Sequence, residues 1–132
     1  MLRLEQRIDF DPRLRELVKV RASLINGCAF CIDMHWTEAR ERGEPEHRLA
    51  QLAAWHESPF FDDRERAALA LTDAVTHVAE THVPDDVWEE AERHFERGEL
   101  AHLLFAIGAI NLWNRVEVAA RAMPASYRAE AE

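Results

Sequence analysis

Apolar side chains recur every three or four residues along almost the whole chain, with polar residues between them. No segment shows sustained alternation of apolar and polar residues, rich in β-branched side chains, which is typical of a strand. The hydrophobic pattern therefore predicts an all-α protein of about six helices.

Residues typical of helix starts and ends divide this pattern into segments. Asp11-Pro12 begins a first helix, which ends or turns at the strong turn pair Asn26-Gly27. A second helix runs from about Cys28 to Arg42 and ends at Gly43, a residue suited to a helix C-terminus. The two segments together predict a helix-turn-helix unit.

Four further helices are predicted after this unit. The first of them runs from Pro45 to about Trp55, and the second begins with the capping-box pattern Asp62-Asp63-Arg64-Glu65. The third runs from Val83-Pro84 to Gly98, and the fourth from Glu99 to about Met123. The last of them is apolar around much of its circumference, which predicts burial on several sides or a subunit interface.

The length of 132 residues suits a single domain that buries roughly two thirds of its unfolded surface. We expect one domain over 1–132, with a core at about 11–123 and a loosely held tail at 124–132. The N-terminal residues contain no apolar run of signal-peptide length, and charged residues interrupt every other apolar stretch. The sequence therefore predicts a cytoplasmic protein.

The formal net charge is −9, from 25 acidic and 16 basic residues, and no cluster of basic residues stands out. A protein that binds a polyanion usually carries such a cluster. We therefore expect neither nucleic acid nor a membrane as a partner.

The two cysteines, Cys28 and Cys31, are three residues apart, and His35 follows one helical turn later. In a helix these three positions share one face. A cysteine pair in a reducing compartment is more often catalytic or metal-binding than a structural disulfide. The segment is thus a candidate reactive dithiol with an imidazole beside it.

Only a thiolate attacks a peroxide or a disulfide, so a working cysteine needs its pKa lowered or its proton accepted. The backbone N–H groups at the start of the second helix favour an anion there. His35 could accept the proton, and a carboxylate usually orients such a histidine. Glu16 is the main candidate, because the turn brings the first helix back alongside the second; Asp9, Asp33 and Glu38 remain open.

A zinc site is the alternative chemistry for the same residues. Cys28, Cys31 and His35 would supply three ligands, and Glu16 or another histidine the fourth. The other histidines form no second pair with a cysteine, which structural zinc sites usually have. The protein would then be a zinc-stabilised or redox-sensing regulatory module without enzymatic turnover.

The spacing of Glu16, Cys28, Cys31 and His35 resembles the signature E-x11-C-x2-C-x3-H of AhpD-like alkylhydroperoxidases, which belong to the carboxymuconolactone decarboxylase family. The long apolar last helix, with the segment Ile110-Asn111-Leu112-Trp113-Asn114-Arg115, is similar to the closing helix of that family. The resemblance covers about residues 11–123.

This resemblance implies an all-helical subunit that forms homotrimers or hexamers and reduces hydroperoxides. It implies that Cys31 is the peroxidatic nucleophile, that Cys28 resolves it as a disulfide, and that Glu16 and His35 form a proton relay. The reductant would be a dithiol, on a lipoylated or a thioredoxin-like protein, and no metal or organic cofactor is required. Some relatives have a histidine where this chain has Phe30, and the lactone decarboxylases of the family generally lack the cysteine pair.

Overall fold

Residues 2–131, which the computed structural model describes, fold into helices and contain no strand, so the all-α prediction is confirmed. Met1 and Glu132, at the two ends of the predicted domain, lie outside the described residues. The elements are α1 (Leu2–Arg7), α2 (Pro12–Asn26), α3 (Ala29–Glu41), α4 (Glu46–Gln51), the 3₁₀-helix η1 (Leu52–Ala54), α5 (Asp63–Thr76), α6 (Val78–Thr81), α7 (Asp85–His94), α8 (Arg97–Ala119) and α9 (Ala125–Ala131).

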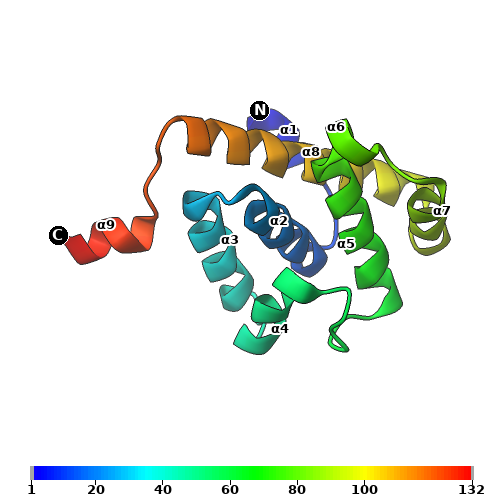
Figure 1. Ribbon diagram of the computed structural model, residues 1–132, viewed down its shortest axis with the longest axis horizontal. Helices are drawn as coiled ribbons and strands as arrows, with labels where there is room; N and C mark the ends of the chain where they lie inside the picture. Colours follow the sequence, from blue (N-terminus) through cyan, green and yellow to red (C-terminus); the bar gives the residue numbers. More distant parts are fainter. Residues whose placement is uncertain (1, 132) are drawn as a thin grey trace.

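Helix α2 lies at the centre of the molecule and packs against α3, α5 and α8 (Figure 1). It begins where the sequence predicts, because the Asp11 side chain accepts hydrogen bonds from two backbone N–H groups of its first turn and Pro12 suits the first helical position. Leu17, Val18 and Val20 are fully buried. This central helix provides the apolar surface against which the cysteine-bearing helix α3 is held.

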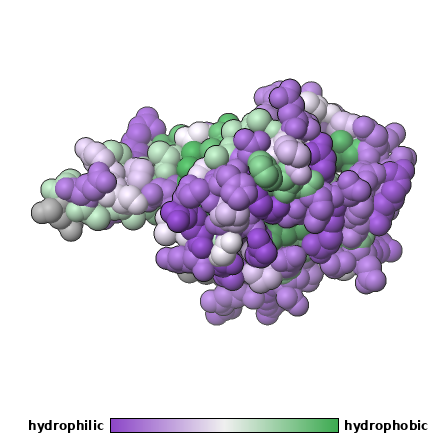
Figure 2. All heavy atoms as spheres, turned by 90° about the horizontal axis from the view of Figure 1, so that it is seen from below, coloured by the Kyte–Doolittle hydropathy of each residue, from purple (hydrophilic) through white to green (hydrophobic). Residues whose placement is uncertain are grey.

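Helix α8 crosses the ends of α2 and α3 and is buried on one side only. Leu103 and Ile107 face the core, whereas Phe105, Leu112 and Val116 are exposed. On the face of the molecule that Figure 2 shows, hydrophobic atoms gather in patches between mostly hydrophilic side chains. None of the described helices is both long enough and apolar enough to cross a membrane.

The structure describes more helices than the six predicted: α1, α6 and α9 were not predicted, and the helix expected from Pro45 to about Trp55 divides into α4 and η1. The last predicted helix ends at Ala119 and not at about Met123. Gly98 does not end α7, which ends at His94. It lies inside α8, which begins at Arg97, two residues before the predicted Glu99, because Glu96 and Glu99 form a reciprocal capping box. The described part of the tail is helical, as α9, and Ser126 donates hydrogen bonds from its backbone N–H and its hydroxyl to Asp33 of α3. The tail is therefore tied to the helix that carries the cysteines.

Candidate functional site

The turn between α2 and α3 places the cysteines. Gly27 has a positive φ of 66°, which glycine adopts without the strain other residues would meet. The N–H of Gly27 donates to the carbonyl of Leu24, and the N–H of Cys28 donates to the carbonyl of Ser23. This pattern closes α2 as a Schellman motif and starts α3 at the next residue.

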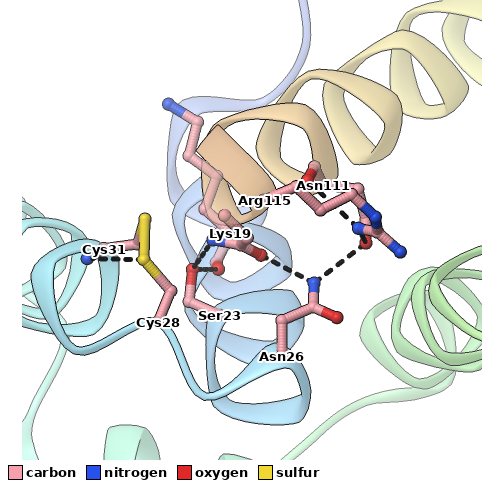
Figure 3. The surroundings of a disulfide bond; sticks show 8 residues. Lys19, Ser23, Asn26, Cys28, Cys31, Asn111 and Arg115 are labelled. Carbon is pink, nitrogen blue, oxygen red and sulfur yellow. Dashed lines mark hydrogen bonds between the residues drawn. A yellow bond between two sulfur atoms is a disulfide. The ribbon is translucent and has the colours of Figure 1, made fainter. Parts of the chain in front are cut away.

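Cys28 is the N-cap residue of α3, and its Sγ accepts a hydrogen bond from the N–H of Cys31 at 3.3 Å. Cys28 and Cys31 are joined in a disulfide, with their Cα atoms 5.3 Å apart, and both are almost fully buried (Figure 3). The backbone N–H groups at the predicted helix start would therefore stabilise a negative charge on Cys28 most directly, since one of them points at its sulfur.

The structure brings Glu16 of α2 and His35 of α3 together. Glu16 is 1% exposed, and its Oε2 lies 3.6 Å from Nδ1 of His35. Glu38, one turn further along α3, places its Oε2 3.2 Å from the same nitrogen. Two carboxylates therefore flank one imidazole nitrogen. Both were candidates from the sequence, which favoured Glu16 and left Glu38 open.

The other two candidate carboxylates lie elsewhere. Asp33 accepts hydrogen bonds from Ser126 of α9. Asp9 contributes its backbone N–H, which donates to Nδ1 of His102 at 2.9 Å. Neither group lies against His35 among the contacts of the described residues.

Glu16 is held as a carboxylate although it is buried. Burial raises the pKa of Glu16, but the nearby imidazole of His35 and the ammonium of Lys19 outweigh it, so the net shift is downward. Lys19 lies 3.6 Å from Oε1 of Glu16. The protein thus keeps a negative charge behind the imidazole at neutral pH.

This arrangement determines which imidazole nitrogen can act as a base. A neutral histidine carries one ring proton, and two carboxylate oxygens facing Nδ1 favour that proton on Nδ1. Nε2 is then the nitrogen with a free lone pair. In this favoured tautomer His35 can accept a proton on the side away from Glu16.

A cavity of about 350 Å³ reaches Cys31 and His35 from the surface. Phe30 lines it, whereas Trp36 lines a different depression on the other side of α3. Cys28 is not among the lining residues. The cavity is lined by Glu5, Lys19, Phe30, Cys31, Met34, His35, Glu38, Trp113 and Glu117.

The donor atoms that could hold a metal ion differ from those of the predicted zinc site. Among residues 2–131, Glu16, His35 and Glu38 have donor atoms within 4.8 Å of one another. The two cysteines are not part of this group, and as a disulfide they supply no thiolate. A metal at this place would be bound by nitrogen and oxygen.

A buried amide network, which the sequence analysis did not assign, holds the cysteine turn against α8. The Nδ2 of Asn26 donates to the side-chain oxygens of Asn111 and Asn114, at 2.9 and 2.8 Å. Asn114 in turn donates to the hydroxyl of Ser23, and Arg115 donates to Asn111 (Figure 3). The available sequence signal was two asparagines three residues apart in the largely apolar middle of α8.

An all-helical domain with a Cys-x-x-Cys pair at a helix start, beside a buried glutamate and histidine, is the architecture of the AhpD-like class of thiol proteins. The sequence model of the carboxymuconolactone decarboxylase family matches residues 5–74, more than half of the chain. The chain belongs to this family, as its sequence signature predicts.

Comparison with relatives supports this assignment. The uncharacterized protein YdfG of Bacillus subtilis is 43% identical over 105 residues, which cover 80% of this chain and 71% of YdfG. The uncharacterized protein YnjA of Escherichia coli is 34% identical over 107 residues, which cover 81% of this chain and 58% of YnjA.

Solved structures agree with the fold. ATU0492 of Agrobacterium tumefaciens, a protein of unknown function described as a candidate antioxidant defence protein AhpD, is 44% identical, with a TM-score of 0.91 over 93% of this chain and 86% of that one. The debrominase Bmp8 is 21% identical with a TM-score of 0.79, over 91% of this chain and 64% of Bmp8, and shares the fold.

Proposed function

We propose that this protein is a dithiol-dependent peroxidase that reduces organic hydroperoxides. The observation that carries the proposal is the cavity that Cys31 and His35 line together, with the carboxylate of Glu16 buried behind the imidazole. A nucleophile, a base and a group that orients the base are the components of an activated thiol.

The first step is attack by Cys31. His35 accepts the thiol proton at Nε2, and the thiolate attacks one oxygen of the hydroperoxide. The O–O bond breaks, Cys31 becomes a sulfenic acid, and the alkoxide leaves as an alcohol after taking the proton from His35. Glu16 stabilises the transient imidazolium, since its negative charge lies 3.6 Å from Nδ1.

Cys28 then resolves the sulfenic acid. Its sulfur attacks the sulfur of Cys31, water leaves with the hydroxyl oxygen, and the disulfide forms. The pair is already within bonding reach in the fold, with Cα atoms 5.3 Å apart. The disulfide form described above would be the product of this step.

An external dithiol, on a lipoylated or thioredoxin-like protein, completes the cycle. Its first thiolate attacks Cys31, whose side chain lines the cavity, and Cys28 leaves as a thiolate. The N–H of Cys31 that points at Cys28 Sγ stabilises this leaving group. The second thiol of the reductant then releases Cys31 and carries away the disulfide.

The cavity wall suggests the substrate class. Phe30, Met34 and Trp113 offer apolar surface, while Glu5 and Glu117 add negative charge. An uncharged organic hydroperoxide gains contact with the apolar wall and avoids the repulsion that an anionic one meets. Neutral hydroperoxides are therefore the proposed substrates, with Phe30 as part of their binding surface.

The test is consumption of cumene hydroperoxide with a lipoyl dithiol or with thioredoxin as reductant. Wild-type protein should turn over many times with one of the two, and intact mass should show a loss of two hydrogens after peroxide alone. The variant Cys31→Ser should consume none. A single stoichiometric oxidation without turnover with either reductant would favour a redox-sensing role instead.

Two broader features belong to the same proposal. Exposed apolar residues on α8 and α9 support a homo-oligomer, a trimer or hexamer. These residues are Phe105, Leu112, Val116, Val118 and Tyr127. Light scattering at micromolar protein concentration measures the oligomeric state. A cysteine pair that is cyclically reduced also suits the cytoplasm. A monomer at micromolar concentration would contradict the proposed homo-oligomer.

A further inference from the structure

We propose that Glu16, His35 and Glu38 bind a divalent transition-metal ion, for which Zn²⁺ and Co²⁺ are suitable probes. The site lies on the Nδ1 side of the imidazole, and neither cysteine belongs to its donor group. Its three donor atoms come from α2 and α3 and lie within 4.8 Å of one another. Imidazole nitrogen with carboxylate oxygens is a donor set that zinc commonly accepts.

The spacing of the donor atoms is close to that of the ligands of a metal ion, although Nδ1 of His35 is also within hydrogen-bond distance of Glu38. Zinc holds nitrogen and oxygen ligands at about 2.1 Å, so two ligands of a tetrahedral site are roughly 3.4 Å apart. Nδ1 of His35 lies 3.6 Å from Oε2 of Glu16 and 3.2 Å from Oε2 of Glu38. The two distances bracket the tetrahedral value, so the ligands need only small movements.

A second, independent observation is the state of Oε2 of Glu16. This atom is buried and has no hydrogen-bond partner, and the residue is 1% exposed. Buried carboxylate oxygens without partners are rare because leaving them unsatisfied is costly. Lys19 and Arg42 both approach Oε1, at 3.6 and 3.9 Å, so they leave Oε2 directed at His35.

The charges around the site also favour a cation. The cavity that adjoins it carries further carboxylates from α1 and α8, so acidic groups outnumber the cations that face the same region. The acidic groups are Glu5, Glu16, Glu38 and Glu117, and the cations are Lys19 and Arg42. A divalent ion would balance this excess.

Metal binding would switch off the base. A metal on Nδ1 replaces the proton there, and a neutral imidazole then carries its proton on Nε2. His35 could no longer accept the proton of Cys31. This inhibitory consequence rests on the proposed peroxidase function, whereas metal binding itself does not.

The experiment uses the disulfide form of the full chain, stripped of metal with a chelator, and titrates it with Co²⁺ while the visible d–d spectrum is recorded. We expect one equivalent to bind, without the sulfur-to-cobalt charge-transfer band that thiolate ligands produce. Zn²⁺ should displace the Co²⁺. Glu38→Gln should weaken binding by more than about tenfold, since the loss of even an outer-shell partner can do so.

Glu41→Gln is the matched control, because Glu41 is an exposed glutamate on the same helix, and its Co²⁺ affinity should equal that of wild type. The half-exposed position of Glu38 makes its replacement harmless to folding, which circular dichroism checks. Failure of the disulfide form to bind Co²⁺, or equal binding by Glu38→Gln, would overturn the proposal. Binding only after reduction, with a thiolate charge-transfer band, would overturn it too.

The two proposals can fail separately. If the disulfide form binds the metal but metal-free protein does not turn over hydroperoxide, the metal site is supported and the peroxidase function is refuted. Turnover that is unaffected by Zn²⁺ in protein shown to bind it would overturn the inhibitory consequence. Turnover without any binding would remove only the metal site.

Discussion

Replacing Asn114 with alanine tests whether the buried amide network holds the cysteine turn against α8. Asn114 is fully buried; its Oδ1 accepts from Asn26 at 2.8 Å, and its Nδ2 donates to the hydroxyl of Ser23 at 3.0 Å. Each buried hydrogen bond contributes about 0.5–1.5 kcal/mol net. Loss of the packed amide adds a cavity term of about 1 kcal/mol.

The sum predicts that Asn114→Ala lowers the free energy of unfolding by about 2–4 kcal/mol. In this variant Asn26 keeps its hydrogen bond to Asn111, so the decrease in the free energy of unfolding should not exceed this range. Urea unfolding at one fixed protein concentration measures it, and the slope with urea should not change. Gln6→Ala, which removes an exposed amide from α1, should stay within about 0.5 kcal/mol of wild type. A loss below about 1 kcal/mol would show that the network does not stabilise the turn as argued.

Three further predictions concern the cysteines, their relay and a helix start. Glu16→Gln should slow the oxidation of Cys31 by about 10²- to 10⁴-fold in stopped-flow mixing with cumene hydroperoxide, whereas exposed Glu57→Gln should not; full activity would remove Glu16 from the relay. Cys28→Ser should stop at a sulfenic acid that a dimedone probe traps, whereas wild type should form the disulfide instead; equal dimedone trapping in wild type would show that Cys28 is not the resolving residue. Asp62→Ala should cost about 1 kcal/mol in urea unfolding, because Asp62 caps α5 by accepting from the N–H of Glu65 at 2.8 Å; an unchanged midpoint would contradict that role.

Local signals predicted the helix-turn-helix unit and the placement of its cysteines. Pro12 and Gly27 act through their own backbone preferences, so the bounds of α2 follow from residues within it or next to it. The capping box at Asp62 works in the same way for the start of α5. These backbone preferences and capping contacts involve neighbouring residues only, which is why a sequence alone can predict them.

Long-range contacts were harder to predict. The return of the first helix alongside the second favoured Glu16 as the partner of His35, and a known family spacing supported it. The second carboxylate, Glu38, could not be separated from its rivals. The amide network joins Asn26 to residues more than 80 positions away, and the helical tail depends on Ser126 reaching Asp33. Neither pairing has a local pattern, since both depend on how α8 and the tail return to the start of α3.

The disulfide closes a very short loop, because its two cysteines are only three residues apart and both belong to one helix start. Cross-linking so short a loop removes only about 2 kcal/mol of chain entropy from the unfolded state, and it pins no two helices together. We therefore expect oxidation and reduction to alternate without a rearrangement of whole helices. A partner would then distinguish the two states at the cysteines themselves.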